Sequence, residues 1–334
     1  MHFINISDLA GPTWRFLEPL STDPQVSWSM HYGRPRNWFE KSVPRPALGR
    51  YRAAWMAAHA ARGRTDAVLV SHLPRVSAAT NRARRWLCPD TPHIAFAFNF
   101  TDLPQGRDRA RLTRGLRGID AYVVFSRFEQ AQYPAYFDLP PDRVHYLPWT
   151  MEPPLPGPDS PVTGSTPYLC SIGGEGRDYA LLAQAMAALP RQRMVIVARP
   201  YSVAGIAFPD NVEVFTNLPK QQTWRVAADS LGLVVPLQSD QTACGHITII
   251  GGQLLGLPLL VTRSRGVEDY ITEGQTGLLM AAGDKAGMIK ALRHLAEDRP
   301  AAQALGQAAR IKARQDNSPA VWLEYFNAVA RTGF

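Results

Sequence analysis

The chain has 334 residues, a length typical of two domains that each bury a core of their own. Hydrophobic residues make up 46% and charged residues 19% of the composition, which excludes global disorder and predicts a globular protein. Three cysteines too far apart for a disulfide framework, no apolar run of membrane-spanning length and no leader peptide at the N-terminus predict a cytoplasmic location.

The net charge of +8 is concentrated in the first half of the chain. Residues 1–150 carry 20 Lys and Arg against 12 Asp and Glu, whereas residues 151–334 carry 16 of each. This asymmetry indicates an anionic partner for the first half: a phosphorylated acceptor, an acidic lipid surface or nucleic acid. Scattered surface arginines also serve solubility alone, so a solvated basic face is the plain alternative.

Short apolar runs alternate with helical patterns along the first half. The predicted strands are residues 3–7, 67–71, 93–98, 121–126 and 144–147, and the predicted helices are residues 48–62, 76–87, 107–116 and 128–136. Strands that alternate with helices are typical of a parallel, doubly wound sheet.

The alternation stops at residues 151–166, where five prolines and two glycines predict an extended linker. It then resumes with strands at 168–172, 193–198, 212–215, 232–236, 258–262 and 277–279, and with helices at 179–188, 221–228, 247–255, 285–297, 300–315 and 319–330. We therefore predict the α/β class with two Rossmann-like domains, 1–150 and 167–317, and a C-terminal helical segment, 318–334. Ligands of such a pair are expected in the cleft between the domains, at the carboxyl ends of the strands.

Several common catalytic motifs are absent from the sequence. It contains no GxSxG, HExxH, GxxxxGK[ST], GxGxxG or DxD pattern, which argues against the usual hydrolases, zinc proteases, P-loop enzymes and dinucleotide-binding enzymes. The eight histidines show no metal-ligand spacing, so no metal and no resident cofactor are expected.

A glycine-rich turn follows the first strand of the second half. Gly173, Gly174 and Gly176 let the backbone approach a ligand closely, and the helix behind them begins with unpaired N–H groups. Arg177 stands where this turn becomes helix and can bind a phosphate with two hydrogen bonds. An ordinary tight turn with a solvated arginine is the alternative.

Two further turns of the second half carry candidate ligand-binding residues. Gly245 and His246 precede a helix whose first turn contains Ile247 and Thr248, which predicts a second anion site at a helix N-terminus. A lone histidine more often caps or packs than binds. Glu268 and Asp269 begin a later short helix, where carboxylates commonly only complement the helix dipole.

Taken together, residues 167–330 resemble the C-terminal donor-binding domain of GT-B glycosyltransferases, closest to the glycosyltransferase family 4-like group. The resemblance implies that Gly173, Gly174 and Arg177 hold the diphosphate of a nucleotide sugar. It implies further that the donor site includes the residues of the two later turns: Gly245, His246, Ile247, Thr248, Glu268 and Asp269. It also places the base near residues 217–220 and lets the last helix cross back to the first domain.

The sequence departs from this family at the two glutamates of its E-x7-E motif. The matching positions are Ala243 and Gly251, so neither carboxylate is present. Two hypotheses remain for the ribose: it approaches the backbone at Gly251 and Gly252, or Glu268 binds its hydroxyls.

The acceptor side is expected in the first half of the chain. Asp102, in the loop after residues 93–98, is the candidate general base for an inverting transfer, with a turn-capping role as the alternative. With Asp102, Arg177 and His246 are the predicted catalytic residues. Arginines and aromatic rings in two loops predict acceptor contacts, with core packing of the tryptophans as the alternative. These candidates are Trp14, Arg15, Arg34 and Arg36.

The leading interpretation is a metal-independent glycosyltransferase that moves a sugar from a nucleotide-sugar donor to a glycan or lipid-linked acceptor, in bacterial surface polysaccharide or glycolipid synthesis. Five arginines in residues 107–117 are interpreted first as a solvated basic face and second as a docking face for an anionic inner-membrane surface, whereas nucleic acid is an unlikely partner. The alternatives are a non-catalytic sugar-nucleotide or nucleic-acid binding protein of the same fold, and a GT-B nucleotide-sugar epimerase.

Overall fold

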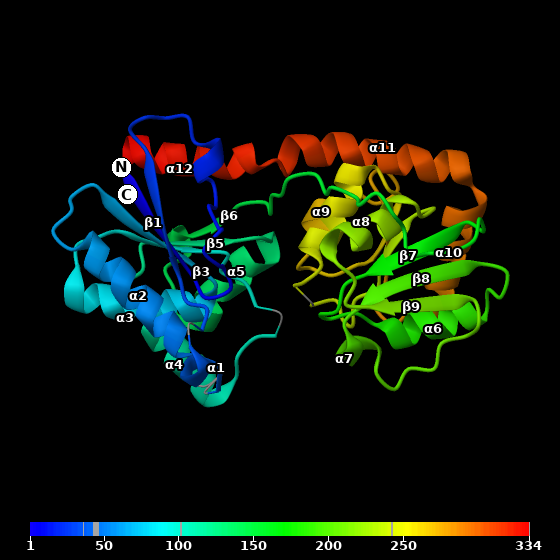
Figure 1. The fold of residues 1–334 in the computed structure, drawn as a ribbon, viewed down its shortest axis with the longest axis horizontal. Coiled ribbons are helices and arrows are strands. Elements are labelled where there is room, and N and C mark those ends of the chain that lie inside the picture. The colour runs from blue at the N-terminus through cyan, green and yellow to red at the C-terminus, as the bar shows by residue number, and fades with distance from the viewer. Residues whose placement is uncertain (36, 43–46, 101, 242, 334) are drawn as a thin grey trace. The chain divides into compact units, whose positions relative to one another are not determined.

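The computed structural model describes residues 1–35, 37–42, 47–100, 102–241 and 243–333 (Figure 1). Contacts divide the chain into unit 1, Met1–Pro148 with Pro319–Phe334, and unit 2, Trp149–Ser318. Residues 151–166 contain no helix or strand and belong to unit 2, where the Gly157 N–H donates to the carbonyl oxygen of Gln221 at 2.9 Å. The proline-rich segment is therefore attached to the second unit along its length.

Unit 1 is built on a six-stranded parallel sheet with the strand order β2-β1-β3-β4-β5-β6. Its strands are β1 (His2–Ser7), β2 (Ser27–Tyr32), β3 (Ala67–His72), β4 (His93–Phe96), β5 (Ala121–Val124) and β6 (Val144–Tyr146). Its helices are α1 (Trp38–Ser42), α2 (Leu48–Ala61), α3 (Pro74–Leu87), α4 (Gly106–Leu116), α5 (Arg127–Phe137) and α12 (Pro319–Thr332), with 3-10 turns at Glu18–Leu20 and Pro141–Arg143. The strand order reverses direction between β1 and β3, which makes the carboxyl ends of these strands the natural ligand edge.

The two faces of this sheet are covered by different elements because successive side chains of a strand point to opposite faces. Ile4 and Ile6 of β1 pack in one buried cluster with alanines of α2 and α3. Phe3 points to the other face, where its ring lies 5.1 Å from that of Phe326 on α12. The C-terminal helix thus supplies part of the core of unit 1, and Figure 1 shows α12 alongside the strands of this unit.

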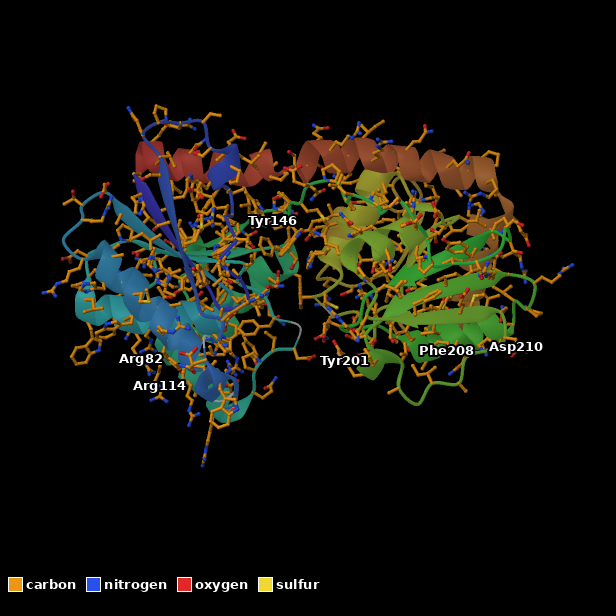
Figure 2. All side chains as sticks on the ribbon, viewed as in Figure 1. Arg82, Arg114, Tyr146, Tyr201, Phe208 and Asp210 are labelled. Atoms are coloured by element: carbon orange, nitrogen blue, oxygen red, sulfur yellow. The ribbon has the colours of Figure 1, made fainter. Side chains whose placement is uncertain are left out.

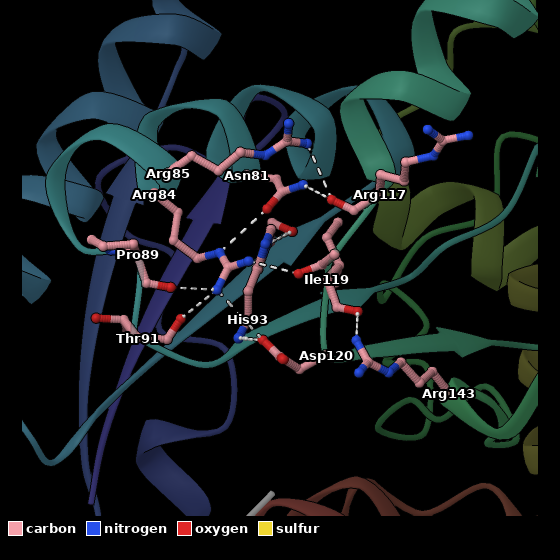
Figure 3. A network of polar contacts seen from close by, with 12 residues as sticks. Asn81, Arg84, Arg85, Pro89, Thr91, His93, Arg117, Ile119, Asp120 and Arg143 are labelled. Atoms are coloured by element: carbon pink, nitrogen blue, oxygen red, sulfur yellow. Dashed lines mark hydrogen bonds and ion pairs between the residues drawn. The ribbon is translucent and has the colours of Figure 1, made fainter. Parts of the chain in front are cut away.

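A buried arginine near the end of α3 forms hydrogen bonds to the loops that precede β4 and β5 (Figure 3). The Arg84 guanidinium donates to the carbonyl oxygens of Pro89, Thr91 and Gly118 at 3.0, 3.1 and 2.6 Å, and its Nε donates to Asn81 Oδ1 at 3.2 Å. Since a buried cation is tolerated only when its donors are satisfied, this network has a structural role.

Unit 2 contains a second six-stranded parallel sheet, with the order β12-β11-β10-β7-β8-β9. Its strands are β7 (Tyr168–Ile172), β8 (Arg193–Ala198), β9 (Val212–Thr216), β10 (Leu233–Val235), β11 (Leu259–Thr262) and β12 (Leu278–Met280). Its helices are α6 (Tyr179–Ala187), α7 (Pro200–Val203), α8 (Lys220–Ala228), α9 (His246–Leu255), α10 (Lys285–Glu297) and α11 (Arg299–Asp316), with a 3-10 turn at Glu268–Tyr270. Counted from its own first strand, this order is 3-2-1-4-5-6, the arrangement of dinucleotide-binding Rossmann sheets.

Buried residues on each side of this second sheet form separate cores. Val195 and Val197 of β8 pack with α8 and α9, whereas Met194 and Ile196 of the same strand pack with α6 and α10. Both faces are covered, which explains why these strands are continuous apolar runs in the sequence.

The predicted α/β class with two Rossmann-like units is confirmed. Each predicted strand and helix has a counterpart in the structure, with ends that differ by up to two residues. The sequence analysis missed β2 and the short helices α1 and α7. The β2 sequence, Ser27–Tyr32, alternates polar and apolar residues at the edge of the sheet and has no apolar run.

Candidate donor site

The candidate site of unit 2 lies at the carboxyl ends of β7 and β10. These strands are neighbours, and the chain leaves them toward opposite sides of the sheet, because β8 follows on one flank and β11 on the other. Such a reversal opens a crevice between the two outgoing loops. The loop after β7 carries Gly173 to Arg177, and the loop after β10 leads to Gly245 at the start of α9.

Arg177 is the central residue of this edge. It is only 6% exposed, and its guanidinium donates to the Glu175 carbonyl oxygen at 3.0 Å and to Thr248 Oγ1 at 3.1 Å. Its buried Nε has no hydrogen-bond partner among the described residues. A buried guanidinium with an unsatisfied N–H is costly, and an anion bound nearby would lower that cost by offsetting the charge of the cation.

The glycines around Arg177 leave room for its guanidinium. At Gly173, where φ is +121°, a Cβ atom would lie 2.7 Å from Arg177 Nη2. Gly245 has φ of +108°, and a Cβ there would lie 3.5 Å from Arg177 Nη1. At Gly174 a Cβ would lie 2.6 Å from the Cγ of Arg199. Gly173 and Gly245 therefore have positive φ values that favour glycine, and at Gly173 the close contact with Arg177 favours it as well.

The two helix N-termini expected near the phosphate differ in their capping. In α6 the Asp178 side chain accepts a hydrogen bond from the Leu181 N–H at 2.9 Å, so a carboxylate already caps the first turn. In α9 the N-cap is Gly245, and among the described residues no side-chain cap is seen at this end. The first turn of α9 is therefore the better anion site of the two.

His246 lies at the first position of α9 and is buried. Its Nε2–H donates to the Gly266 carbonyl oxygen at 3.0 Å, and its ring lies 5.1 Å from that of Tyr270 and 6.2 Å from that of Trp149. Burial lowers the pKa of His246 to about 4, so the imidazole is neutral at physiological pH. His246 therefore holds the turn at Gly266 against α9 and contributes no charge.

A pocket of about 290 Å³ opens beside Arg177 within unit 2. It is lined by both predicted and unexpected residues: Ile172, Gly173, Gly174, Val197, Ala198, Arg199, Asn217, Leu218, Lys220, Thr223, Trp224, Ile247 and Thr248. The sequence analysis missed Arg199, which follows β8 directly, and Trp224 of α8. The signal that points to Arg199 is a cation at the carboxyl end of a central strand, and only the strand order shows that it faces this pocket.

The positions that match the family's two glutamates are packed into the protein. Ala243 is 5% exposed, and a Cβ at Gly251 would lie 2.2 Å from the Trp224 ring. A Cβ at Gly252 would lie 2.8 Å from the Leu233 side chain. The hypothesis that the ribose approaches the backbone at Gly251 and Gly252 is therefore wrong, because both glycines face core side chains.

The remaining donor candidates lie on the segment after β11. Glu268 is exposed and Asp269 half-buried on the 3-10 turn, and the Glu268 N–H donates to the Ser264 carbonyl oxygen at 2.9 Å. Their turn adjoins Gly266, which accepts from His246. Ile247 is half exposed at the pocket, whereas Thr248 is buried against Arg177.

The acceptor candidates of unit 1 lie in loops after β1, β2 and β4. Trp14 is half-buried, and its ring lies 4.9 Å from that of His72. It therefore packs against a buried side chain of unit 1. Arg15 is exposed, and Arg34 donates to the Leu9 carbonyl oxygen at 2.9 Å. Asp102 is exposed in the loop after β4. Arg36 lies outside the described residues.

The described residues contain no group of three or more His, Cys, Asp or Glu side chains placed to hold a metal ion. Within the same residues no helix is long and apolar enough to cross a membrane. Independence of metal and the site of action in the cell stay predictions.

Comparison with known proteins identifies this architecture. Sucrose-phosphate synthase from Thermosynechococcus elongatus superposes with a TM-score of 0.74 at 15% identity, over 99% of this chain and 98% of that one. Anabaena HepE in complex with UDP-glucose superposes with a TM-score of 0.72 at 10% identity, over 99% and 100%. The chain has the GT-B fold. The resemblance to GT-B glycosyltransferases seen in the sequence is confirmed.

Sequence comparison locates the GT-B signal in unit 2. Residues 204–312 match the family model "Glycosyl transferases group 1". Sulfoquinovosyl transferase SQD2 of Arabidopsis thaliana is 29% identical over 156 residues, which make up 43% of this chain and 29% of that relative. The match thus spans less than a third of the relative's length.

Proposed function

We propose that this chain is a glycosyltransferase that moves a sugar from a nucleotide-diphosphate sugar to a hydroxyl of a glycan or lipid-linked acceptor. The observation that carries the proposal is Arg177, a buried cation with an unsatisfied Nε at the strand reversal of a GT-B donor unit. The family match of residues 204–312 supports the same activity.

The pocket beside Arg177 suits a nucleoside diphosphate. Its volume lies at the lower end of ordinary ligand pockets, and its walls combine apolar side chains such as Leu218 with the cations of Arg199 and Lys220. We place the diphosphate between Arg177 and the uncapped first turn of α9, and the nucleoside along Trp224 and Asn217. UDP and UDP-glucose in the structures of HepE are consistent with this class of ligand.

The reaction breaks the bond between the sugar anomeric carbon and the diphosphate oxygen, and the acceptor oxygen forms the new bond to that carbon. Negative charge grows on the leaving diphosphate, where the Arg177 cation and the α9 N–H groups stabilise it without a metal ion. The acceptor hydroxyl loses its proton to Asp102 if the transfer inverts the anomeric centre. Neutral His246 positions the turn that carries Glu268 and Asp269, and we assign these two side chains to the donor.

The test is thermal stabilisation by a panel of nucleoside diphosphates and nucleotide sugars, with and without EDTA. We expect a shift that is selective for one base, unaffected by EDTA and absent in Arg177→Ala, since a charged hydrogen bond to phosphate is worth about 10- to 100-fold in affinity. Arg177→Lys keeps the charge and should retain a weaker shift. Arg293→Ala, an exposed arginine of α10, is the matched control.

No shift with any nucleotide would overturn the proposal, and a shift that requires Mg²⁺ would overturn its metal independence. The missing glutamates favour a second candidate, a sugar-nucleotide binding protein without turnover. A selective nucleotide shift with no sugar release or transfer from the matching nucleotide sugar would favour it.

For the acceptor we propose a class of molecule, and for the place of action an association with a membrane surface. A surface polysaccharide or glycolipid precursor fits the expected bacterial context, and association of α4 with an anionic membrane stays a prediction. Its test is binding of the protein to phosphatidylglycerol-containing vesicles.

A further inference from the structure

A groove of about 550 Å³ lies on the helical side of unit 1, between α2, α3 and α4. Six arginines line it: Arg50, Arg75, Arg82, Arg85, Arg111 and Arg114. Among the described residues, Asp108 is the one carboxylate in its lining. Figure 2 labels Arg82 and Arg114, which lie on this side of unit 1.

The groove carries more positive charge than the carboxylates paired with its arginines neutralise. Arg75 pairs with Asp108 at 2.6 Å, and Arg50 pairs with Asp8 at 2.6 Å. Arg85 donates to backbone carbonyl oxygens of Arg114 and Arg117, which leaves its charge uncompensated.

Arg82 and Arg111 are exposed and make no hydrogen bond or ion pair with the described residues. Converging, uncompensated guanidinium groups repel one another, and anionic groups along the groove would relieve this repulsion.

The groove is elongated and begins at the ligand edge of the sheet. The helices α3 and α4 follow β3 and β4, so Arg75 and Asp108 in their first turns lie at the carboxyl ends of the strands. Asp8, the partner of Arg50, follows β1 directly. From Arg75 the groove continues along α3 to Trp86, a length of about 16 Å at about 1.5 Å per residue.

The lining between the arginines is apolar or aromatic. The helices α3 and α4 approach closely at Gly115, where a Cβ would lie 2.9 Å from the Ala78 Cβ. Tyr51 and Trp86 are 44% and 81% exposed, and their ring faces can stack on sugar rings. A groove lined by cations and aromatic rings along the length of a helix fits one extended saccharide chain better than a flat bilayer surface.

We propose that this groove binds an extended anionic glycan, a saccharide chain that carries phosphate, sulfate or carboxylate groups. Given the proposed transferase function, this saccharide is the acceptor. Its reacting end lies at the carboxyl edge of the unit 1 sheet, and the rest of the saccharide follows α3 and α4. The proposal extends the acceptor site beyond the loops that the sequence indicated.

The test measures binding of the full chain to a heparin-derived sulfated oligosaccharide, its desulfated counterpart, a single-stranded oligonucleotide of similar charge, and phosphatidylglycerol-containing vesicles. We expect binding of the sulfated saccharide, little binding of the desulfated one, and at least a tenfold loss in Arg82→Glu/Arg111→Glu. The slope of log affinity against log salt should also fall by about two, one for each lost contact.

The matched control is Arg62→Glu/Arg331→Glu, which makes the same change in charge at exposed arginines of unit 1 outside the groove. It should retain affinity within about twofold. Equal loss in both double variants would show a non-specific charge effect and overturn the proposal. Tighter binding of the oligonucleotide, or binding of vesicles alone, would overturn it in favour of nucleic acid or a membrane.

Nucleotide-induced stabilisation, measured on the same groove variants, separates this proposal from the proposed function. Arg82 and Arg111 belong to unit 1, so nucleotide binding by unit 2 should be unchanged. Saccharide binding without any nucleotide shift would support the groove and contradict the transferase. A nucleotide shift without saccharide binding would do the reverse.

Discussion

Burial shifts the pKa values of three histidines and one glutamate of this protein toward their neutral forms. His72 and His93 of unit 1 and His246 of unit 2 are all buried, and burial lowers the pKa of each. Glu129 is the opposite case, since burial raises its pKa to about 7 although Tyr133 and Ser126 donate to it. These residues couple the stability of both units to pH.

His246 makes unit 2 less stable in acid. Unfolded histidine binds a proton near pH 6.5 and folded His246 only near pH 4, so the unfolded state holds more protons between these values. Stability therefore falls as the pH drops from about 6.5 to 4, by up to about 1.4 kcal/mol per pH unit from this residue. Urea unfolding between pH 7 and 4 should be less pH-dependent in His246→Gln than in the wild type.

The matched control for that titration is His59→Gln at an exposed position of α2. It should retain the wild-type pH dependence. An unchanged profile in His246→Gln would show that the pKa of His246 is the same in the folded and the unfolded protein, and would contradict this account.

Asp102 can be tested as the general base once a donor and acceptor are known. Removing a base from an inverting transfer costs about 10²- to 10⁴-fold in kcat, so Asp102→Asn should lose that much while nucleotide binding is retained. Asp90→Asn, at an exposed aspartate after α3, is the control and should keep full activity. An undiminished kcat in Asp102→Asn would exclude the base role.

At the scale of elements, α8 and α9 are in close contact at position 251, which the sequence resemblance matched to the second glutamate of the E-x7-E motif. The Trp224 ring of α8 occupies the space that a side chain at position 251 would need. Trp224 also lines the candidate donor pocket, so the helix contact and the pocket wall are parts of one arrangement. At this point a buried ring fills the space beside Gly251.

Gly251→Ala should therefore disturb both stability and the pocket. Its Cβ would overlap the Trp224 ring, and overpacking of this kind costs about 1–3 kcal/mol. We expect lower thermal stability and weaker nucleotide binding, measured by thermal unfolding with and without the best nucleotide. Gly157→Ala, where the nearest atoms lie at 3.4 Å, should be close to neutral. Equal behaviour of the two variants would contradict the packing account.

The elements that sequence reasoning predicted well are those with a strong periodic signal. The strand β8, Arg193–Ala198, reads as a buried apolar run because both faces of its sheet are covered, and the helix α10 has polar residues on one side only. The tight turn at Gly173 and Gly174 is evident in the sequence because glycine has a local conformational role, while its binding of a phosphate stays a prediction.

The rest depends on long-range pairing that no local pattern encodes. Arg199 and Trp224 reach the pocket only because β8 lies beside β7 and α8 packs against α9. The arginine groove likewise needs α2, α3 and α4 side by side, although its charges are evident in the sequence. The edge strand β2 was missed because its serines interrupt the apolar signal.

At the scale of the whole molecule, unit 1 is assembled from both ends of the chain. Phe326 of α12 is fully buried, and its ring lies 5.1 to 5.7 Å from those of Phe3, Trp28, Phe16 and Phe96. Trp322 adds a hydrogen bond from its Nε1 to the Pro148 carbonyl oxygen at 2.8 Å. The last helix is thus a core element of unit 1.

Phe326→Ala should destabilise unit 1 by about 3–5 kcal/mol, because it removes a buried aromatic ring from a packed cluster. Unit 2 contains none of this cluster, so its nucleotide-dependent thermal shift should persist. Thermal unfolding should separate into an early transition for unit 1 and a later, nucleotide-sensitive one. Glu324→Ala, an exposed position on the same helix, should unfold like the wild type, and a lost nucleotide shift in Phe326→Ala would contradict the division into units.

The origin of α12 at the far end of the chain sets an order on folding during synthesis. A ribosome releases the strands of unit 1 first, then the whole of unit 2, and α12 last. Until α12 emerges, the sheet face that carries Phe3, Trp28 and Phe96 lacks its cover, while unit 2 already has every residue it needs. The nascent protein therefore completes its second unit before its first, and a chaperone that binds exposed aromatic surface would act in that interval.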